Sequence, residues 1–413
     1  MHAAADRLVT LADVRAARMV LDGVLRHTPL EFSRALEPYA GGAAYLKCEH
    51  LQRTGSFKIR GAYVRIARLT PEERSRGVVA ASAGNHAQGV ALAASMLGVQ
   101  ARVFMPVSVP LPKLAATKAY GAQVELVGDD LGGSLMAAQD HAQRTGAVFI
   151  HPFDSADVIA GQGTVGLEIL EQCPSVRTIL VGTGGGGLLS GIGAAVKGLR
   201  PEAAVVGVQA SGAAAFPPSL AAGRPVTLES MHTMADGIAV PRPAEITYAN
   251  VTAYADEVVT VDEEAISRAL LLCLERAKMM TEPAGAASVA ALLQHAGRFE
   301  PPVVAVLSGG NIDPVLLMRV VQHGMVAAGR YLSLRLTVPD SPGSLARLLG
   351  AIAGVGANVL DIEHSRIDSD LHLGEVQVDV RLETKGQGHQ AEVVGSLREH
   401  GYGVLAQNDP GAE

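Results

Sequence analysis

Residues 178–196, with the sequence TILVGTGGGGLLSGIGAAV, are the clearest indication of the fold in this chain. The run from Thr178 to Gly182 is apolar enough for a buried strand, and the apolar residues from Leu188 to Val196 recur at helical spacing. Four consecutive glycines, Gly184 to Gly187, connect the two. A strand that leads through glycines into a helix is typical of a parallel sheet, and it presents N–H groups to an anion. We therefore predict an α/β fold with a phosphate site at this turn; a flexible turn without a ligand is the alternative.

The glycine turn also fits the pattern GxGxxG through Gly182, Gly184 and Gly187. That pattern alone would suggest a dinucleotide. A dinucleotide site needs a carboxylate for the ribose near the end of the next strand. The next predicted strand ends at Gln209 and Ala210 instead, so the sequence disfavours NAD.

Short β-rich runs alternate with longer helical patterns over residues 44–320, which predicts an open, mostly parallel sheet architecture in two lobes. Helical spacing is clear at Ala87 to Leu97, Ile266 to Met280 and Ala284 to Leu293. The expected strands are Val78 to Ser82, Ala101 to Met105, Gln123 to Val127, Val148 to His151, Thr178 to Gly182, Ala204 to Val208 and Val303 to Ser308.

The pattern changes after Gly324. Leu332, Leu334, Leu336 and Val338 alternate with polar residues, as in a strand that is buried on one face. The following residues predict the order βαββαβ, which forms a small two-layer α+β module. We expect a catalytic domain over residues 1–322 in two lobes, a linker over 323–330 and a separate domain over 331–413.

Three predicted strands end in small or polar residues before a helix begins. Besides the glycine turn, these ends are Ser82-Ala83-Gly84-Asn85-His86 and Ser308-Gly309-Gly310-Asn311. Ligands of open α/β sheets bind beyond the carboxyl ends of the strands. The three turns are therefore expected to surround one ligand. The alternative for the first is that Ser82 or Asn85 serves only as a helix cap.

Lys58 is one of only seven lysines, and it lies in Gly55-Ser56-Phe57-Lys58-Ile59-Arg60-Gly61, upstream of the three turns. Most lysines are solvated surface charges. A lysine combined with a phosphate site, however, suits pyridoxal phosphate, whose aldehyde needs an amine and whose phosphate needs fixed donors.

These motifs, in this order, resemble the threonine and serine dehydratases of the pyridoxal-phosphate fold type II family, whose fold is tryptophan-synthase-β-like. The resemblance covers residues 10–322. Residues 331–407, with Asp340-Ser341-Pro342-Gly343 at the first turn, look like an ACT domain, a small module that senses amino acids.

The resemblance implies that Lys58 binds the cofactor covalently and then acts on the substrate α-proton. It implies further that Phe57 packs on the cofactor ring, Asn85 hydrogen-bonds the ring hydroxyl and Ser308 faces the pyridine nitrogen. Gly184, Gly185, Gly186, Gly187 and Leu188 would hold the phosphate. Ser82, Ala83, Gly84, Asn85 and His86 would bind the substrate carboxylate. Glu282 matches a family motif near the cofactor. An active-site role and a purely structural role as a carboxylate at a helix start are equally expected for it.

The activity implied is β-elimination of L-threonine to 2-oxobutanoate and ammonia, with L-serine as a further substrate and amino-acid regulation through the ACT domain. A serine dehydratase or serine racemase is the alternative. Racemising relatives have a serine where this chain has Ala83, which disfavours racemisation. An inactive amino-acid-binding regulatory protein is the alternative from another class, and Lys58 argues against it.

Composition limits the partners. A net charge of −7 without a long basic run leaves no footprint for nucleic acid. The sequence contains no run of about 18 apolar residues, the length that a membrane-spanning helix needs. Three widely separated cysteines fit a reducing cytoplasm. Gln209, Ala213 and Ala215 stand where relatives bind a divalent ion, so no divalent metal site is expected. The family resemblance implies a homo-oligomer, a dimer or tetramer.

Overall fold

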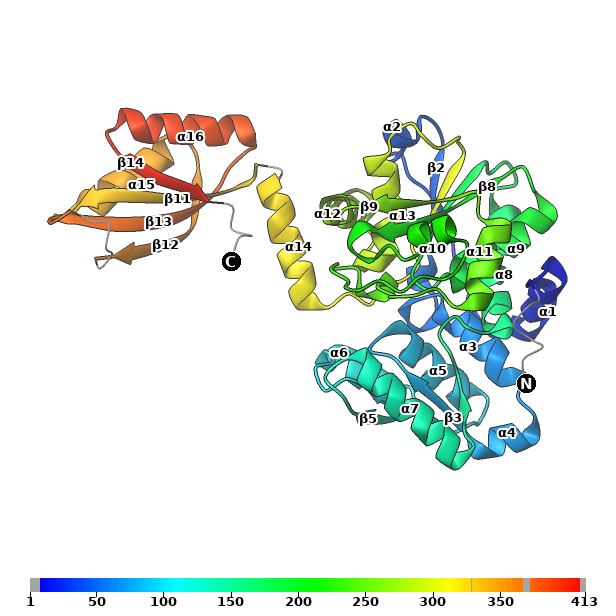
Figure 1. The fold of residues 1–413 in the computed structure, drawn as a ribbon. Coiled ribbons are helices and arrows are strands. Elements are labelled where there is room, and N and C mark those ends of the chain that lie inside the picture. The colour runs from blue at the N-terminus through cyan, green and yellow to red at the C-terminus, as the bar shows by residue number, and fades with distance from the viewer. Residues whose placement is uncertain (1–7, 328, 367–371, 409–413) are drawn as a thin grey trace. The chain divides into compact units, whose positions relative to one another are not determined.

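The computed structural model describes residues 8–327, 329–366 and 372–408. The chain divides into two compact units, residues 1–313 and 314–413 (Figure 1). Helix α14 (Pro314–Ala327) therefore belongs to the second unit and extends into the segment 323–330 that the sequence suggests as a linker. Residue 328 of that segment lies outside the described residues. The extents of the catalytic domain, the linker and the ACT-like domain stay a proposal.

One lobe of the first unit contains a four-stranded parallel sheet, covered by helices on both faces. Val78 and Ala80 pack in one core with helix α5, whereas Val79 and Ala81 pack in another with Ala138 of helix α7. This alternation follows from the period of two along a strand. In spatial order the strands are β5 (Gln123–Leu126), β4 (Ala101–Met105), β3 (Val78–Ala81) and β6 (Val148–Phe149).

The other lobe contains a six-stranded sheet in which only the pairing of the edge strand β1 with β2 is antiparallel. Ile179 and Val181 pack in one core with Leu189 and Ile192 of helix α9, and helix α13 contacts the sheet as well. In spatial order the strands are β1 (Leu30–Phe32), β2 (Ala44–Lys47), β10 (Val303–Val306), β7 (Thr178–Gly182), β8 (Ala204–Ala210) and β9 (Glu257–Val261).

Helix α3 joins the two lobes, because it contacts α5 of the first and α8 beside the second. The approach to α8 is so close that a Cβ on Gly161 would lie 2.6 Å from the Cα of Gly61. The helices of this unit are α1 (Leu11–Leu21), α2 (Glu37–Ala40), α3 (Lys58–Ala67), α4 (Pro71–Arg76), α5 (Asn85–Met96), α6 (Leu111–Ala119), α7 (Leu131–Thr145), α8 (Ala156–Gln172), α9 (Gly187–Leu199), α10 (Phe216–Ala222), α11 (Glu245–Tyr254), α12 (Glu263–Leu272) and α13 (Pro283–Gln294).

Short helical turns complete the first unit. They are η1 (Glu49–Leu51), η2 (Arg53–Gly55), η3 (Ser211–Ala213), η4 (Asp236–Ile238) and the π-helical turn η5 (Cys273–Ala277).

After α14, the second unit has the predicted order βαββαβ, with an antiparallel sheet and two helices. Leu332, Leu334, Leu336 and Val338 are buried against this unit's own core, as their alternation predicts. Its elements are β11 (Tyr331–Pro339), α15 (Ser344–Gly354), β12 (Asn358–Ser365), β13 (Glu375–Glu383), α16 (Gln387–Glu399) and β14 (Gly403–Asn408).

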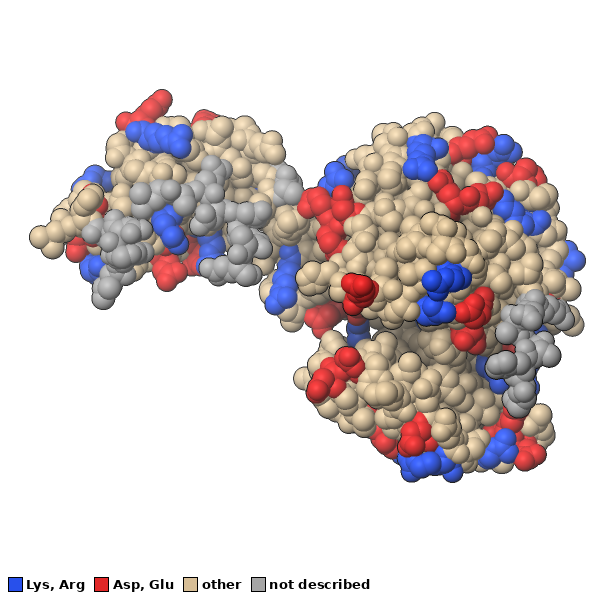
Figure 2. All heavy atoms as spheres, viewed as in Figure 1, with Lys and Arg blue, Asp and Glu red and all other residues tan. Residues whose placement is uncertain are grey.

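The predicted fold class is confirmed: two lobes with mostly parallel sheets are followed by a small βαββαβ module. All seven strands that the sequence indicated in the first unit are present. Among the described helices, none has the length and apolar character needed to cross a membrane. The face in Figure 2 intersperses basic and acidic side chains, and its surface is indented between the two lobes.

Candidate active site

A pocket of about 550 Å³ lies between the two lobes of the first unit. It contains the carboxyl ends of β3 and β7 and the residues after β10, so the three predicted turns meet there. All the residues predicted from the sequence to hold cofactor or substrate line it. They are Phe57, Lys58, Ser82, Ala83, Gly84, Asn85, His86, Gly184, Gly185, Gly186, Gly187, Leu188 and Ser308.

The glycine turn has no room for side chains. A Cβ on Gly185 would lie 2.4 Å from the ring of Phe153, and one on Gly184 would lie 2.9 Å from the Cα of Ile238. Gly186 has a φ of +91°, which glycine adopts readily, and it is the N-cap of α9. In the described structure no side chain caps that helix. Its first N–H groups therefore remain available to an anion.

The loop that carries Lys58 is fixed to the turn after β10 by backbone contacts. Phe57 N–H donates to the carbonyl of Ser308 at 3.2 Å, and Gly310 N–H donates to the carbonyl of Gly55 at 2.9 Å. On its other side Lys58 packs against α5, where a Cβ on Gly89 would lie 3.3 Å from the Lys58 Cβ. The turn after β10 and helix α5 thus fix the position of the Lys58 backbone, from which the side-chain amine extends.

The turn after β3 begins helix α5 without a side-chain cap among the described residues. Gly84 is the N-cap, and its N–H donates to the Ser82 hydroxyl at 3.1 Å. Ser82 therefore stabilises the turn itself rather than the helix end, and the first N–H groups of α5 have no side-chain cap in the described structure. His86 Nε2 donates to the carbonyl of Ile150 at 2.7 Å, because a carbonyl can only accept.

Asn85 connects the turns through both ends of its amide. Its Oδ1 accepts from Asn311 Nδ2 at 2.7 Å, and its Nδ2 donates to Glu282 Oε1 at 2.5 Å. Glu282 is buried and lines the pocket. A Cβ on Gly309 would lie 2.1 Å from Glu282 Oε1, so a side chain there would displace the Glu282 carboxyl group. One proton of the Asn85 amide remains for a ligand.

The pocket shifts three of its titratable groups toward their neutral forms. Desolvation lowers the pKa of Lys58 to about 8, although the carboxyl of Glu282 opposes the shift. Desolvation, aided by the charge of Asp236, raises the pKa of Glu282 to about 7. Desolvation and the charge of Lys58 lower the pKa of His86 to about 3. The Lys58 amine, with a pKa of about 8, is suited to nucleophilic and proton-transfer chemistry.

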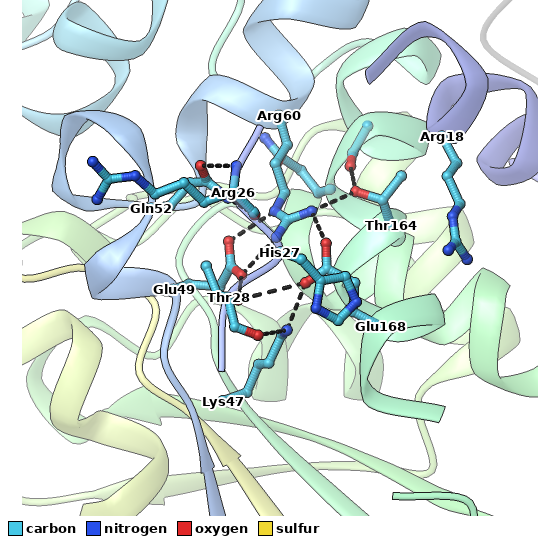
Figure 3. Close-up of polar contacts among 12 residues, drawn as sticks. Arg18, Arg26, His27, Thr28, Lys47, Glu49, Gln52, Arg60, Thr164 and Glu168 are labelled. Atoms are coloured by element: carbon cyan, nitrogen blue, oxygen red, sulfur yellow. Dashed lines mark hydrogen bonds and ion pairs between the residues drawn. The ribbon is translucent and has the colours of Figure 1, made fainter. Parts of the chain in front are cut away.

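Beneath the pocket, α3 is anchored by a buried ion network (Figure 3). Arg60 donates through Nε and Nη2 to Glu49, both at 2.8 Å, and through Nη1 to Glu168 at 2.6 Å. Lys47 Nζ donates to the other oxygen of Glu168 at 2.5 Å and to the carbonyl of Thr28 at 2.8 Å. These four charged side chains are almost entirely buried. The network fixes the helix whose first residue is Lys58.

Several parts of the site carry no signal in the sequence. Outside any of the predicted motifs, the pocket is also lined by Phe153 in the loop before α8, by Lys113 near the start of α6, and by Asp236 and Ile238 of η4. Arg60 likewise has no predicted role in the sequence motifs. Its partner Glu168 lies 108 residues further along the chain, and no local pattern reveals such a pairing.

Comparisons with known proteins identify the family of each unit. Residues 21–309 match the family described as pyridoxal-phosphate dependent enzyme, and residues 330–404 match the ACT domain. The L-threonine ammonia-lyase of Thermotoga maritima is 46% identical over 397 residues, which cover 96% of this chain and 99% of the relative. The catabolic L-threonine dehydratase of Escherichia coli K12 is 41% identical and matches 78% of this chain over 98% of its own length.

Solved structures place the fold in the same group. A threonine deaminase from the organism abbreviated T.th. has a TM-score of 0.70 and 42% identity, covering 74% of this chain and 99% of that protein. Maize serine racemase has a TM-score of 0.72 and 34% identity, and the match covers 78% of this chain and 99% of that protein. This chain therefore belongs to the family of pyridoxal-phosphate-dependent enzymes that includes the threonine ammonia-lyases, and its second unit contains an ACT domain.

Proposed function

We propose that the protein is an L-threonine ammonia-lyase that forms 2-oxobutanoate and ammonia and also accepts L-serine. The observation that carries the proposal is Lys58, whose amine has a depressed pKa and lines a pocket with the uncapped glycine turn. The likeness to an L-threonine ammonia-lyase over 96% of the chain supports it.

The residues of the pocket fit pyridoxal phosphate. The N–H groups of Gly184 to Leu188 would hold its phosphate, because the close packing of the turn keeps every side chain away from them. Lys58 would hold its aldehyde carbon, with Phe57 beside the ring and the Asn85 amide near the ring hydroxyl. Ser308 would face the pyridine nitrogen. When bound, this cofactor supplies an electron-withdrawing ring that stabilises negative charge at the substrate α-carbon.

Lys58 is the base in this proposal. Because its pKa is about 8, a substantial share of the protein carries a neutral amine near neutral pH, and that amine can accept the α-proton at Nζ. A solvated lysine, with a pKa near 10.4, would be neutral in about one molecule per thousand. Ser308 offers the ring nitrogen a neutral hydroxyl instead of a carboxylate, which favours prompt loss of the β-hydroxyl over a long-lived carbanion.

Substrate orientation comes from the turn Ser82 to His86. The first N–H groups of α5 would receive the amino-acid carboxylate, as helix N-termini receive anions. The opposite face of the α-carbon needs a second proton donor for racemisation, and Ala83 supplies no hydroxyl there. We therefore favour elimination over serine racemisation, despite the structural likeness to maize serine racemase.

The proposal can be tested with the purified protein loaded with pyridoxal phosphate. The measurement is 2-oxo acid formation from L-threonine and from L-serine. We expect turnover of both substrates and no D-serine. Visible absorbance of the loaded protein without any 2-oxo acid would instead indicate the inactive amino-acid-binding alternative. D-serine as the main product would indicate a racemase.

We infer that the ACT domain makes turnover respond to an amino acid such as isoleucine or valine, in a homo-oligomer of the cytoplasm. The Escherichia coli catabolic L-threonine dehydratase matches 78% of this chain over 98% of its own length, so the match leaves part of this chain uncovered. Removing residues 331–413 should leave measurable turnover and abolish the response to these amino acids. A response that survives the truncation would contradict the inference.

A further inference from the structure

Lys113 and Asp236 form an ion pair across the rim of the pocket. Lys113 lies on α6 in the lobe of the four-stranded sheet, and Asp236 lies in η4 next to α13 of the other lobe. Lys113 Nζ donates to Asp236 Oδ2 at 2.8 Å. The side chain of Lys113 is only 13% exposed, whereas that of Asp236 is 61% exposed. The ammonium therefore sits inside the pocket wall, and its counter-ion faces solvent.

The ammonium of Lys113 lies directly over the start of helix α5. A Cβ on Gly84 would lie 3.7 Å from Lys113 Nζ and 3.8 Å from its Cδ. Gly84 is the N-cap whose helix has no side-chain cap in the described structure. The positive end of the helix and a positive side chain thus point to the same place, an arrangement that suits an anion.

The other titratable side chains of the pocket lining are mainly carboxyl groups. The lining contains the carboxyl groups of Asp129, Asp130, Asp236 and Glu282. Among the described lining residues, Lys58 and Lys113 are the only lysines, and no arginine is present. A carboxylate ligand would enter against this acidic wall. Since Lys58 is engaged by the cofactor in the proposed function, Lys113 is the remaining cation that can compensate the ligand.

We propose that Lys113 is a substrate-binding residue that recognises the carboxylate of the amino acid, and that Asp236 holds its ammonium in place until that carboxylate arrives. This inference rests on the proposed function for the identity of the ligand as an amino acid. The incoming carboxylate replaces Asp236 as the partner of Lys113 at the start of α5. No covalent bond is made or broken in this exchange.

The test measures binding to the full chain loaded with pyridoxal phosphate, by calorimetry. The two ligands are L-alanine and L-alaninamide, which lack a β-hydroxyl and cannot undergo the elimination, and only the first has a carboxylate. Lys113→Met should weaken L-alanine binding by about 10- to 100-fold, as expected for a lost charge-assisted hydrogen bond, with L-alaninamide changed by less than about 2-fold. Lys113→Arg should retain most of the affinity for L-alanine.

Three comparisons complete the test. Lys118→Met, which removes an exposed lysine from the same helix, should leave both affinities unchanged. Asp236→Asn removes the competing carboxylate, so it should tighten L-alanine binding. The visible absorbance of the bound cofactor should be the same in all these variants, because Lys113 does not hold the cofactor.

Other results would overturn the inference. Unchanged L-alanine binding in Lys113→Met would exclude the role. Equal losses for L-alanine and L-alaninamide, or a loss in Asp236→Asn as large as that in Lys113→Met, would show that the ion pair only holds the lobes together. A wild-type protein that binds L-alanine but forms no 2-oxo acid from threonine would refute the lyase proposal alone and leave this one standing.

Discussion

Arg60 and Lys58 lie two residues apart on helix α3 and point to nearly opposite sides, because successive residues of a helix are 100° apart. Burial opposes the charge of Arg60, but Glu49 and Glu168 outweigh it and raise its pKa. Lys58 has no carboxylate within ion-pair distance among the described residues, and desolvation lowers its pKa to about 8. Paired charges on one side hold the helix, and the amine on the other side, which has no such partner, is shifted toward its neutral form.

The comparison shows how one helix can hold one buried side chain as a paired charge and shift another toward its neutral form. A buried pair keeps its charges because each partner compensates the other. A buried group without a partner shifts toward its neutral form, which is the form that a base needs. The two sets must therefore stay separate, and the predictions below test whether each side can be changed without the other.

The largest effect is expected on the reactive side. Lys58→Ala should lower 2-oxo acid formation from L-threonine by at least about a thousandfold, since it removes both the covalent attachment and the base. Far-ultraviolet circular dichroism should show an unchanged fold. Full turnover in this variant would mean that the two sides of α3 are not divided as described.

The next effect concerns the ion network. Arg60→Met leaves Glu49 buried without an ion-pair partner among the described residues and leaves Glu168 with Lys47 alone, which should lower the free energy of unfolding by about 3 to 5 kcal/mol. Lys58→Met removes an amine whose charged form is already disfavoured by desolvation. The cofactor-free variant should therefore be at least as stable as the wild type. Urea unfolding of the cofactor-free proteins measures both. Equal destabilisation by the two substitutions would remove the distinction between them.

A pH titration sharpens the comparison. The cofactor aldehyde reacts with the neutral amine, and burial lowers the Lys58 pKa to about 8. The rate of pyridoxal phosphate capture by the cofactor-free protein should therefore rise with pH through a midpoint near 8. An ordinary lysine would give a midpoint near 10.4. Stopped-flow absorbance gives the midpoint, and a value above about 10 would show that Lys58 is solvated.

The smallest effect concerns Glu282, whose pKa is raised by desolvation to about 7. A raised pKa means that folding disfavours the ionised form, so the carboxylate costs stability above pH 7 and costs none below about pH 4.5. Glu282→Gln should therefore gain stability relative to the wild type at pH 8 and show no gain at pH 4.5. Thermal unfolding of the cofactor-free proteins at the two values checks this. A gain that is independent of pH would contradict the assignment.

The sequence predicted the parallel sheets well because their central strands are short apolar runs that end in glycine or polar residues, as at Gly182 and Ser308. It did not identify β1, β2 or β9. Strand β1 is an edge strand of three partly exposed residues, and only its antiparallel pairing with β2 defines it. The helix expected from Ile266 to Met280 ends earlier, since α12 gives way to a π-helical turn and Lys278 adopts a φ of +59°.

The candidate site was predictable where chemistry lies in continuous motifs, as around Lys58 and Gly184 to Gly187. It was not predictable where the fold joins distant positions. The pairs Lys113–Asp236 and Arg60–Glu168 are separated by 123 and 108 residues, and each member alone looks like an ordinary charged residue. Only the packing of the lobes and of α3 against α8 brings them together.

The most direct test of the central claim is to load the full chain with pyridoxal phosphate, reduce it with borohydride and map the modified peptide by mass spectrometry. Reduction turns the bond between cofactor and amine into a permanent one. The cofactor mass should appear on the peptide that contains Lys58. Its appearance on Lys113, the other lysine of the pocket lining, or on any further lysine would contradict the account.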